Sequence, residues 1–110
     1  MDRNDASPLG AALDALWARF LPEMESRVAT LESAAEAFQA DRLSEEEQKA
    51  AHSAAHKLAG VLGTFGLTRG TVLARELEMM YAQQNGRDDT EAGQLKQIAA
   101  ELRGIVAGRK

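Results

Sequence analysis

Two histidines, His52 and His56, are the residues of this chain whose type and spacing could do chemistry. Side chains four residues apart project from one face of an α-helix, so this pair could chelate a metal ion such as zinc. However, Ser53 stands where an H-E-x-x-H motif would have its glutamate, and the chain has no third histidine and no cysteine. Carboxylates would have to complete such a site, and the sequence therefore favours no metal site.

His56 is set apart from the apolar stripe of its own segment. At 100° per residue, it lies roughly 140° from the middle of that stripe and should point to solvent or to a partner. The stripe consists of Ala51, Ala55, Leu58, Leu62 and Phe65. The neighbours of His56 on its own face are Lys49, His52, Ala59, Gly60 and Gly63. Each glycine inside a helix costs about 1 kcal/mol relative to alanine. Either the two glycines open a path to the imidazole for another protein, or they allow close helix packing, and the residues alone leave both open.

The elements that must position His56 are amphipathic helices, because apolar residues recur at helical spacing and strand-like runs are missing. Ser7 is a candidate cap, and Pro22 is expected to break the chain between the first two helices. Ser44 with Glu47 forms a capping box, and Gly86 helps to end the fourth helix. The predicted helices span residues 7–21, 22–40, 44–64, 68–85 and 89–107.

Short connections between consecutive helices favour antiparallel neighbours. We therefore predict an all-α single domain over residues 1–110, an antiparallel up-and-down four-helix bundle with an additional N-terminal helix packed across one end. The net charge of -4 and the pI of about 5.2 count against nucleic-acid binding. No apolar run reaches membrane-spanning length, and the lack of cysteine fits a reducing compartment, so we expect a cytoplasmic protein.

The run from Ala55 to Gly66 resembles the signature of histidine-containing phosphotransfer (HPt) domains of two-component phosphorelays. That signature is a histidine on an exposed helix face, leucine two residues on, glycine four on and glycine ten on. Here these positions are His56, Leu58, Gly60 and Gly66. Leu67 and the Leu77-Glu78 pair also stand where the family has leucine and Leu-Glu, so the resemblance covers residues 44–80 in detail.

The resemblance implies a role for several residues. His56 would be the phosphoacceptor through Nε2, because neutral imidazole is a nucleophile near pH 7. Glu78 would accept a hydrogen bond from Nδ1–H and so orient the ring. Many family members have a lysine three residues after the histidine, where this chain has Ala59. The phosphoryl-stabilising charge would then come from Lys57, Arg75 or Lys49.

The resemblance also implies partners. A response-regulator receiver domain would dock on His52, Ala59, Gly60 and Gly63, and a histidine kinase or hybrid kinase would be the other partner. The receiver would bind Mg²⁺, so this chain needs no cofactor, and we expect neither autokinase nor hydrolase activity. We expect a monomer. The alternative is a non-catalytic helical adaptor or degenerate HPt docking module, with which every core stripe is compatible.

Overall fold

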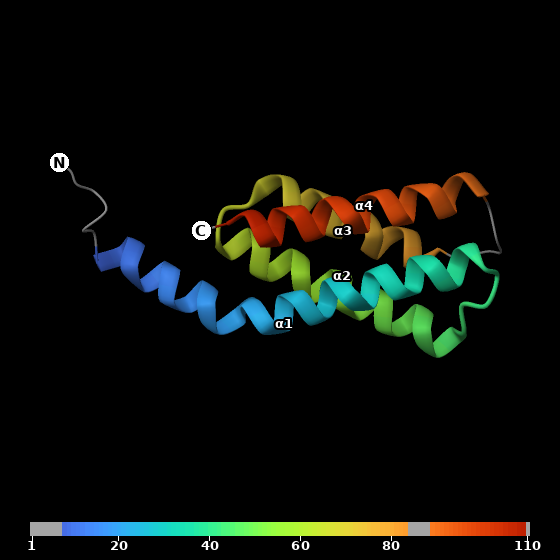
Figure 1. Ribbon diagram of the computed structural model, residues 1–110, viewed down its shortest axis with the longest axis horizontal. Helices are drawn as coiled ribbons and strands as arrows, with labels where there is room; N and C mark the ends of the chain where they lie inside the picture. Colours follow the sequence, from blue (N-terminus) through green and yellow to red (C-terminus); the bar gives the residue numbers. More distant parts are fainter. Residues whose placement is uncertain (1–7, 84–88, 110) are drawn as a thin grey trace.

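Four helices make up the part of the chain that the structure, a computed structural model, describes: residues 8–83 and 89–109 (Figure 1). They are α1 (Pro8–Gln39), α2 (Glu45–Thr64), α3 (Thr68–Ala82) and α4 (Asp89–Gly108). Within the described residues there is no strand, and the all-α prediction is confirmed. The predicted ends at Asn85 and Gly86, and the cap at Ser7, lie outside the described residues.

The first helix is continuous through Pro22, so the prediction of separate helices over 7–21 and 22–40 is wrong. A proline inside a helix removes one backbone hydrogen bond and crowds the preceding turn, which a helix can accommodate by bending. Trp17 and Met24 are buried on either side of Pro22, and this burial favours keeping the segment helical. Instead of forming an additional helix across one end, the first part of α1 continues beyond the end of the bundle, with a change of direction along its length (Figure 1).

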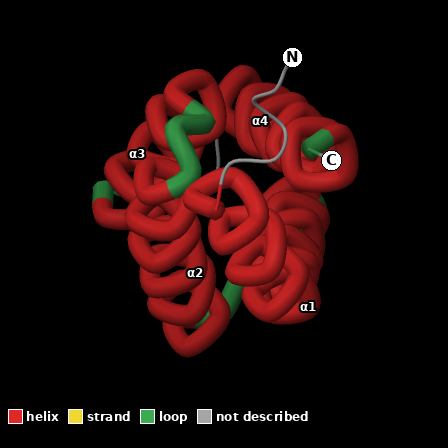
Figure 2. Tube along the Cα trace, turned by 90° about the vertical axis from the view of Figure 1, so that its left-hand side faces the viewer, coloured by secondary structure: helices red, strands yellow, loops and turns green. Residues whose placement is uncertain are grey.

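The helices run alternately up and down and form a ring. α1 packs against α2 and α4, and α3 packs against the same two helices. Figure 2, which looks along the bundle, shows this arrangement of four neighbouring helices. The predicted antiparallel up-and-down bundle is confirmed.

A single apolar core fills the space between the helices. Its largest fully buried side chains are Met24, Val28, Leu31, Leu58, Leu62, Leu77, Tyr81, Leu95 and Leu102. At Gly70 the helices approach closely, because a Cβ there would lie 2.8 Å from Leu62 Cδ1 and 3.3 Å from Ile105 Cγ2. Gly70 therefore lets α3 come close to both α2 and α4.

The ends of α2 follow from local sequence. At its start, the Ser44 hydroxyl accepts from the Glu47 amide and the Glu47 carboxylate accepts from the Ser44 amide, which confirms the capping box. At its end, Gly66 adopts φ 72°, and its amide donates to the Gly63 carbonyl. The Leu67 amide donates to the Leu62 carbonyl, which completes a Schellman motif. Glycine is favoured at this position because side chains disfavour positive φ. Both ends of the helix that carries His56 are thus fixed.

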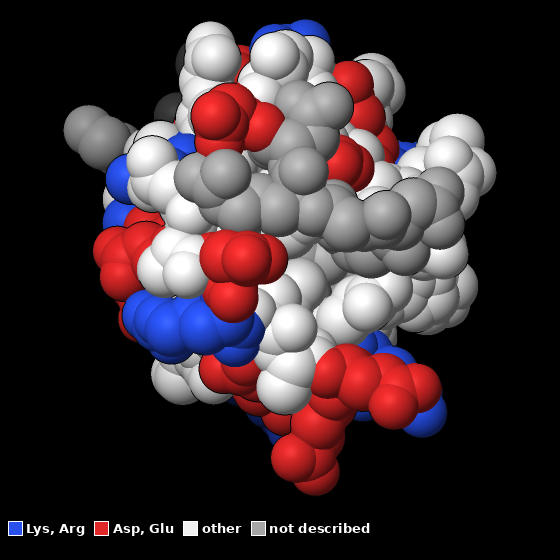
Figure 3. All heavy atoms as spheres, turned by 90° about the vertical axis from the view of Figure 1, so that its right-hand side faces the viewer, with Lys and Arg blue, Asp and Glu red and all other residues white. Residues whose placement is uncertain are grey.

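Acidic side chains gather at the end of the bundle where α2 and α4 begin (Figure 3). The first turn of α2 contains Glu45, Glu46 and Glu47, and the first turn of α4 contains Asp89 and Glu91. Negative charge at a helix N-terminus is favourable because the helix dipole is positive there. The helix dipole therefore explains these carboxylates without a role in function.

None of the helices in the described residues is long and apolar enough to cross a membrane.

Candidate functional site

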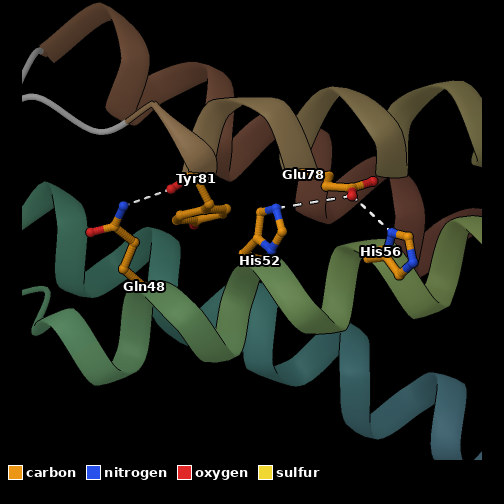
Figure 4. A network of polar contacts seen from close by, with 5 residues as sticks. All are labelled: Gln48, His52, His56, Glu78 and Tyr81. Carbon is orange, nitrogen blue, oxygen red and sulfur yellow. Dashed lines mark hydrogen bonds and ion pairs between the residues drawn. The ribbon is translucent and has the colours of Figure 1, made fainter.

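His56 projects from the outer face of α2, as the sequence predicts, and 68% of its side chain is exposed. Its Nδ1 lies 2.8 Å from Oε2 of Glu78 on α3 (Figure 4). Glu78 follows the buried Leu77, so it stands at the edge of the contact between α2 and α3, with 22% of its side chain exposed. The two residues that the sequence places 22 positions apart are therefore in direct contact.

This contact decides which ring nitrogen is available for chemistry. A carboxylate can only accept, so the proton of neutral His56 is on Nδ1 when the hydrogen bond forms. The lone pair is then on Nε2, which points away from Glu78 (Figure 4). The geometry leaves Nε2 open to another molecule.

The second histidine reaches the same carboxylate from one turn earlier on α2. His52 Nε2 lies 3.9 Å from Glu78 Oε2, and the side chain is partly covered. Further along the same contact between α2 and α3, Gln48 Nε2 donates to the Tyr81 carbonyl at 2.6 Å. The described residues contain no group of three or more metal-ligating side chains arranged to hold an ion. His52 and His56 both contact the Glu78 carboxylate, and His52 lies at the border of the helix face that His56 occupies.

The small residues near His56 divide into exposed and buried ones. A Cβ at Gly60 would meet no described atom within 4 Å, and one at Gly63 would only touch Thr71 Oγ1 at 3.5 Å. Close helix packing therefore does not explain Gly60, which leaves open space beside His56. Ala59 is only 2% exposed, and its predicted place on the docking face is wrong. It lies four residues after Ala55 and shares that residue's burial in the core.

A groove of about 630 Å³ runs beside His56 between α1 and α2. Its apolar lining comes from Leu16, Phe20, Val61 and Phe65. Its polar lining comes from Glu23, Arg27, His56, Lys57, Gly60 and Thr64. The groove joins an exposed imidazole to an apolar surface and two cationic side chains.

Comparison with known proteins identifies the family of this chain. Residues 15–108 match the sequence profile of the family described as Hpt domain. The chain belongs to the Hpt family. This Hpt domain is also similar to Protein RcaC of Microchaete diplosiphon, with 32% identity over 92 residues. The match covers 84% of this chain and 14% of RcaC, so the chain spans a small part of that relative. No solved structure matches it significantly. Membership of the family implies phosphotransfer in two-component signalling.

Of the three basic residues that the sequence offered for the Hpt site, only Lys57 lines the groove with His56. Lys49 is exposed, pairs with Glu45 at 3.9 Å, and lies in a separate hollow with His52. Arg75 is exposed on α3, one turn before Glu78. The structure thus separates these candidates by position.

Sequence reasoning missed the contribution of α1 to the site of this Hpt domain. It named none of Leu16, Phe20 and Arg27 for the site, and it placed Phe65 only on the apolar stripe of its own segment. A possible signal was the apolar stripe of the first segment, which is wider than one helix contact needs and consists of Leu9, Leu13, Leu16, Trp17 and Phe20. Trp17 is the buried member of that stripe, whereas Leu16 and Phe20 remain partly open and line the groove.

Proposed function

We propose that this Hpt domain accepts and donates a phosphoryl group on Nε2 of His56. It would exchange the group with the aspartate of response-regulator receiver domains, or receive it from a histidine kinase. The observation that carries the proposal is the 2.8 Å contact between His56 Nδ1 and Glu78, which leaves Nε2 of this exposed side chain without that partner. Family membership supports the same chemistry.

The transfer needs little from this chain besides a positioned imidazole. The Nε2 lone pair forms the N–P bond while the P–O bond to the receiver aspartate breaks, and its electron pair returns to the carboxylate. The ring then carries a positive charge, which the Glu78 carboxylate stabilises through Nδ1–H. Mg²⁺ would be bound by the receiver, so we expect no metal requirement in the Hpt domain itself. The reverse reaction uses the same groups.

The groove beside His56 is the surface that we assign to the receiver. Leu16, Phe20 and Phe65 offer apolar area, and Gly60 leaves room for the partner backbone next to the imidazole. His52 and Gly63 would border this surface. A relay requires release after transfer, so we expect a small and transient interface. We place the domain in the cytoplasm, as a monomer.

The decisive experiment is phosphotransfer from a panel of phosphorylated receivers and their kinases, with His56→Gln beside the wild type. We expect an acid-labile, alkali-stable label on the wild type and none on His56→Gln. Glu78→Ala should keep the label but acquire it about ten-fold to a hundred-fold more slowly, because a hydrogen bond to a charged group contributes about 1.5–3 kcal/mol. An unlabelled wild type across the panel would favour a non-catalytic adaptor that uses the His56 face only for docking.

A further inference from the structure

A positive charge would stabilise the phosphoryl group on His56, and this chain lacks a lysine three residues after the histidine, where many family members have one. A phosphoryl group carries about two negative charges at neutral pH. Glu78, on the other side of the imidazole ring, adds a further negative charge. The position three residues after His56 is the buried Ala59, which offers no cation. A cation that stabilises the phosphoryl group would therefore come from another position on the surface.

We propose that Arg27 of α1 is the residue that binds the phosphoryl oxygens on His56, and that Glu23 holds its guanidinium when the phosphoryl group is absent. This inference rests on the proposed function, because it assigns the cation of the same site. The juxtaposition comes from the antiparallel packing of α1 and α2, which places Arg27 and His56 on one groove although they are 29 residues apart in sequence.

The surroundings of Arg27 suit this role. Only 23% of its side chain is exposed, so the groove wall restricts the guanidinium. Its Nη2 lies 3.4 Å from Glu23 Oε1, one turn earlier on α1. That pair is weak, since Glu23 is 62% exposed and exposed ion pairs contribute little. A doubly charged phosphoryl group can therefore compete with Glu23 for the guanidinium.

Arg27 also fits better than the other cation of the groove. Guanidinium presents paired N–H donors that match two phosphate oxygens, whereas ammonium is a flexible point charge. Lys57 is exposed and lies about 100° around α2 from His56. Arg27 lines the α1 wall of the groove opposite His56 on α2, and a Cβ at Gly60 in the same groove would meet no described atom within 4 Å. Among the described residues, the charged and titratable groups around the phosphoryl site are thus Arg27 and Glu23 from α1, His52 and Lys57 from α2 and Glu78 from α3.

The test measures the electrostatic environment of the phosphoryl group directly. Potassium phosphoramidate, a small-molecule donor, phosphorylates the purified chain without any partner, and phosphorus NMR follows the titration of the phosphohistidine. His56→Gln identifies the signal of His56 by its loss. We expect Arg27→Gln to raise the pKa of the phosphoryl group by about 0.5, equivalent to about 0.7 kcal/mol. Glu23→Gln should lower it, and Arg27→Lys should restore part of the wild-type value.

Arg103→Gln is the matched control, because Arg103 also pairs with a glutamate, Glu32, but in the contact between α4 and α1. It should leave the phosphoryl pKa unchanged. An unchanged pKa in Arg27→Gln, or a larger rise in Lys57→Gln, overturns the inference, as does a His56 that phosphoramidate cannot phosphorylate. Because no receiver takes part, a positive titration with no transfer from receivers would contradict the proposed function alone.

Discussion

At the scale of single residues, Gly60 affects both the stability of α2 and the access of a partner to His56. It lies inside α2, where glycine is a poorer helix former than alanine by about 1 kcal/mol. A Cβ at this position would meet no described atom within 4 Å, so the fold itself does not require glycine. The space that it leaves lies beside the exposed imidazole of His56. The approach of a partner to His56 is the best explanation for a glycine that lowers the stability of α2.

Replacing Gly60 should therefore separate stability from transfer. Gly60→Ala is expected to raise the free energy of unfolding by about 0.5–1 kcal/mol, because alanine favours the helix. Gly60→Leu should keep the fold but slow phosphoryl transfer from a receiver, since the side chain occupies the approach to His56. Denaturant unfolding and the rate of labelling measure the two effects. Gly104→Leu is the matched control, an open helical glycine on α4 that should not affect transfer. Equal transfer rates for both leucine variants would contradict an access role.

At the scale of helices, the sequence correctly predicted the features that depend on local signals, such as the ends of a helix. Both ends of α2 follow from such signals, the capping box at Ser44 and the glycine at position 66 that adopts positive φ. Pro22 is also a local signal, but burial of apolar residues on both sides outweighs it and α1 stays whole. Local pattern cannot weigh a proline against tertiary packing.

The same limit applies to the site. Helical spacing correctly directed His56 outward, yet it placed Ala59 on the same face, because it cannot tell which flank of α2 the neighbouring helix covers. The contact with Glu78 was anticipated by family resemblance. The position of Arg27 in the groove depends on the register between α1 and α2, and no local pattern in the sequence encodes this register.

The capping box of α2 should make part of the stability depend on pH. Hydrogen bonds from the Ser44 amide and hydroxyl lower the pKa of Glu47 below its ordinary value of 4.5. The ionised carboxylate therefore stabilises the folded state above pH 4.5, and this contribution is lost as the pH falls through the lowered pKa. We expect Glu47→Gln to have a lower Tm than the wild type at pH 7, and the difference to shrink in acid. Glu46→Gln, one residue earlier, loses only the favourable interaction with the helix dipole and should show a smaller effect on Tm. A difference in Tm that is constant with pH would contradict this explanation.

At the scale of the whole molecule, a cluster at one end of the bundle ties the long α1 to the rest. The Trp17 and Phe65 rings meet edge to face, with centroids 5.1 Å apart at 84°. The Arg109 guanidinium lies 4.9 Å from the Trp17 ring centroid and 5.2 Å from that of Phe65. The cluster thus joins α1, the end of α2 and the residue after α4. It also fixes the wall of the groove, because Leu16 and Phe20 flank Trp17 on α1.

Removing Trp17 should therefore affect both stability and docking. Trp17→Ala deletes a side chain that is 5% exposed, and we expect it to cost about 3–5 kcal/mol of unfolding free energy. Trp17→Phe keeps an aromatic ring against Phe65 and should cost less. Unfolding followed by helical circular dichroism measures the loss.

The alanine variant should also separate docking from chemistry. His56 and Glu78 are positioned by α2 and α3, so phosphoramidate should still phosphorylate His56 at the wild-type rate under conditions where the variant is folded. Transfer from a receiver should slow, because the groove wall on α1 is no longer held in place. If receiver transfer stayed at the wild-type rate while stability fell, the groove would not be the docking surface. If both rates fell together, the cluster would support the geometry of His56 itself.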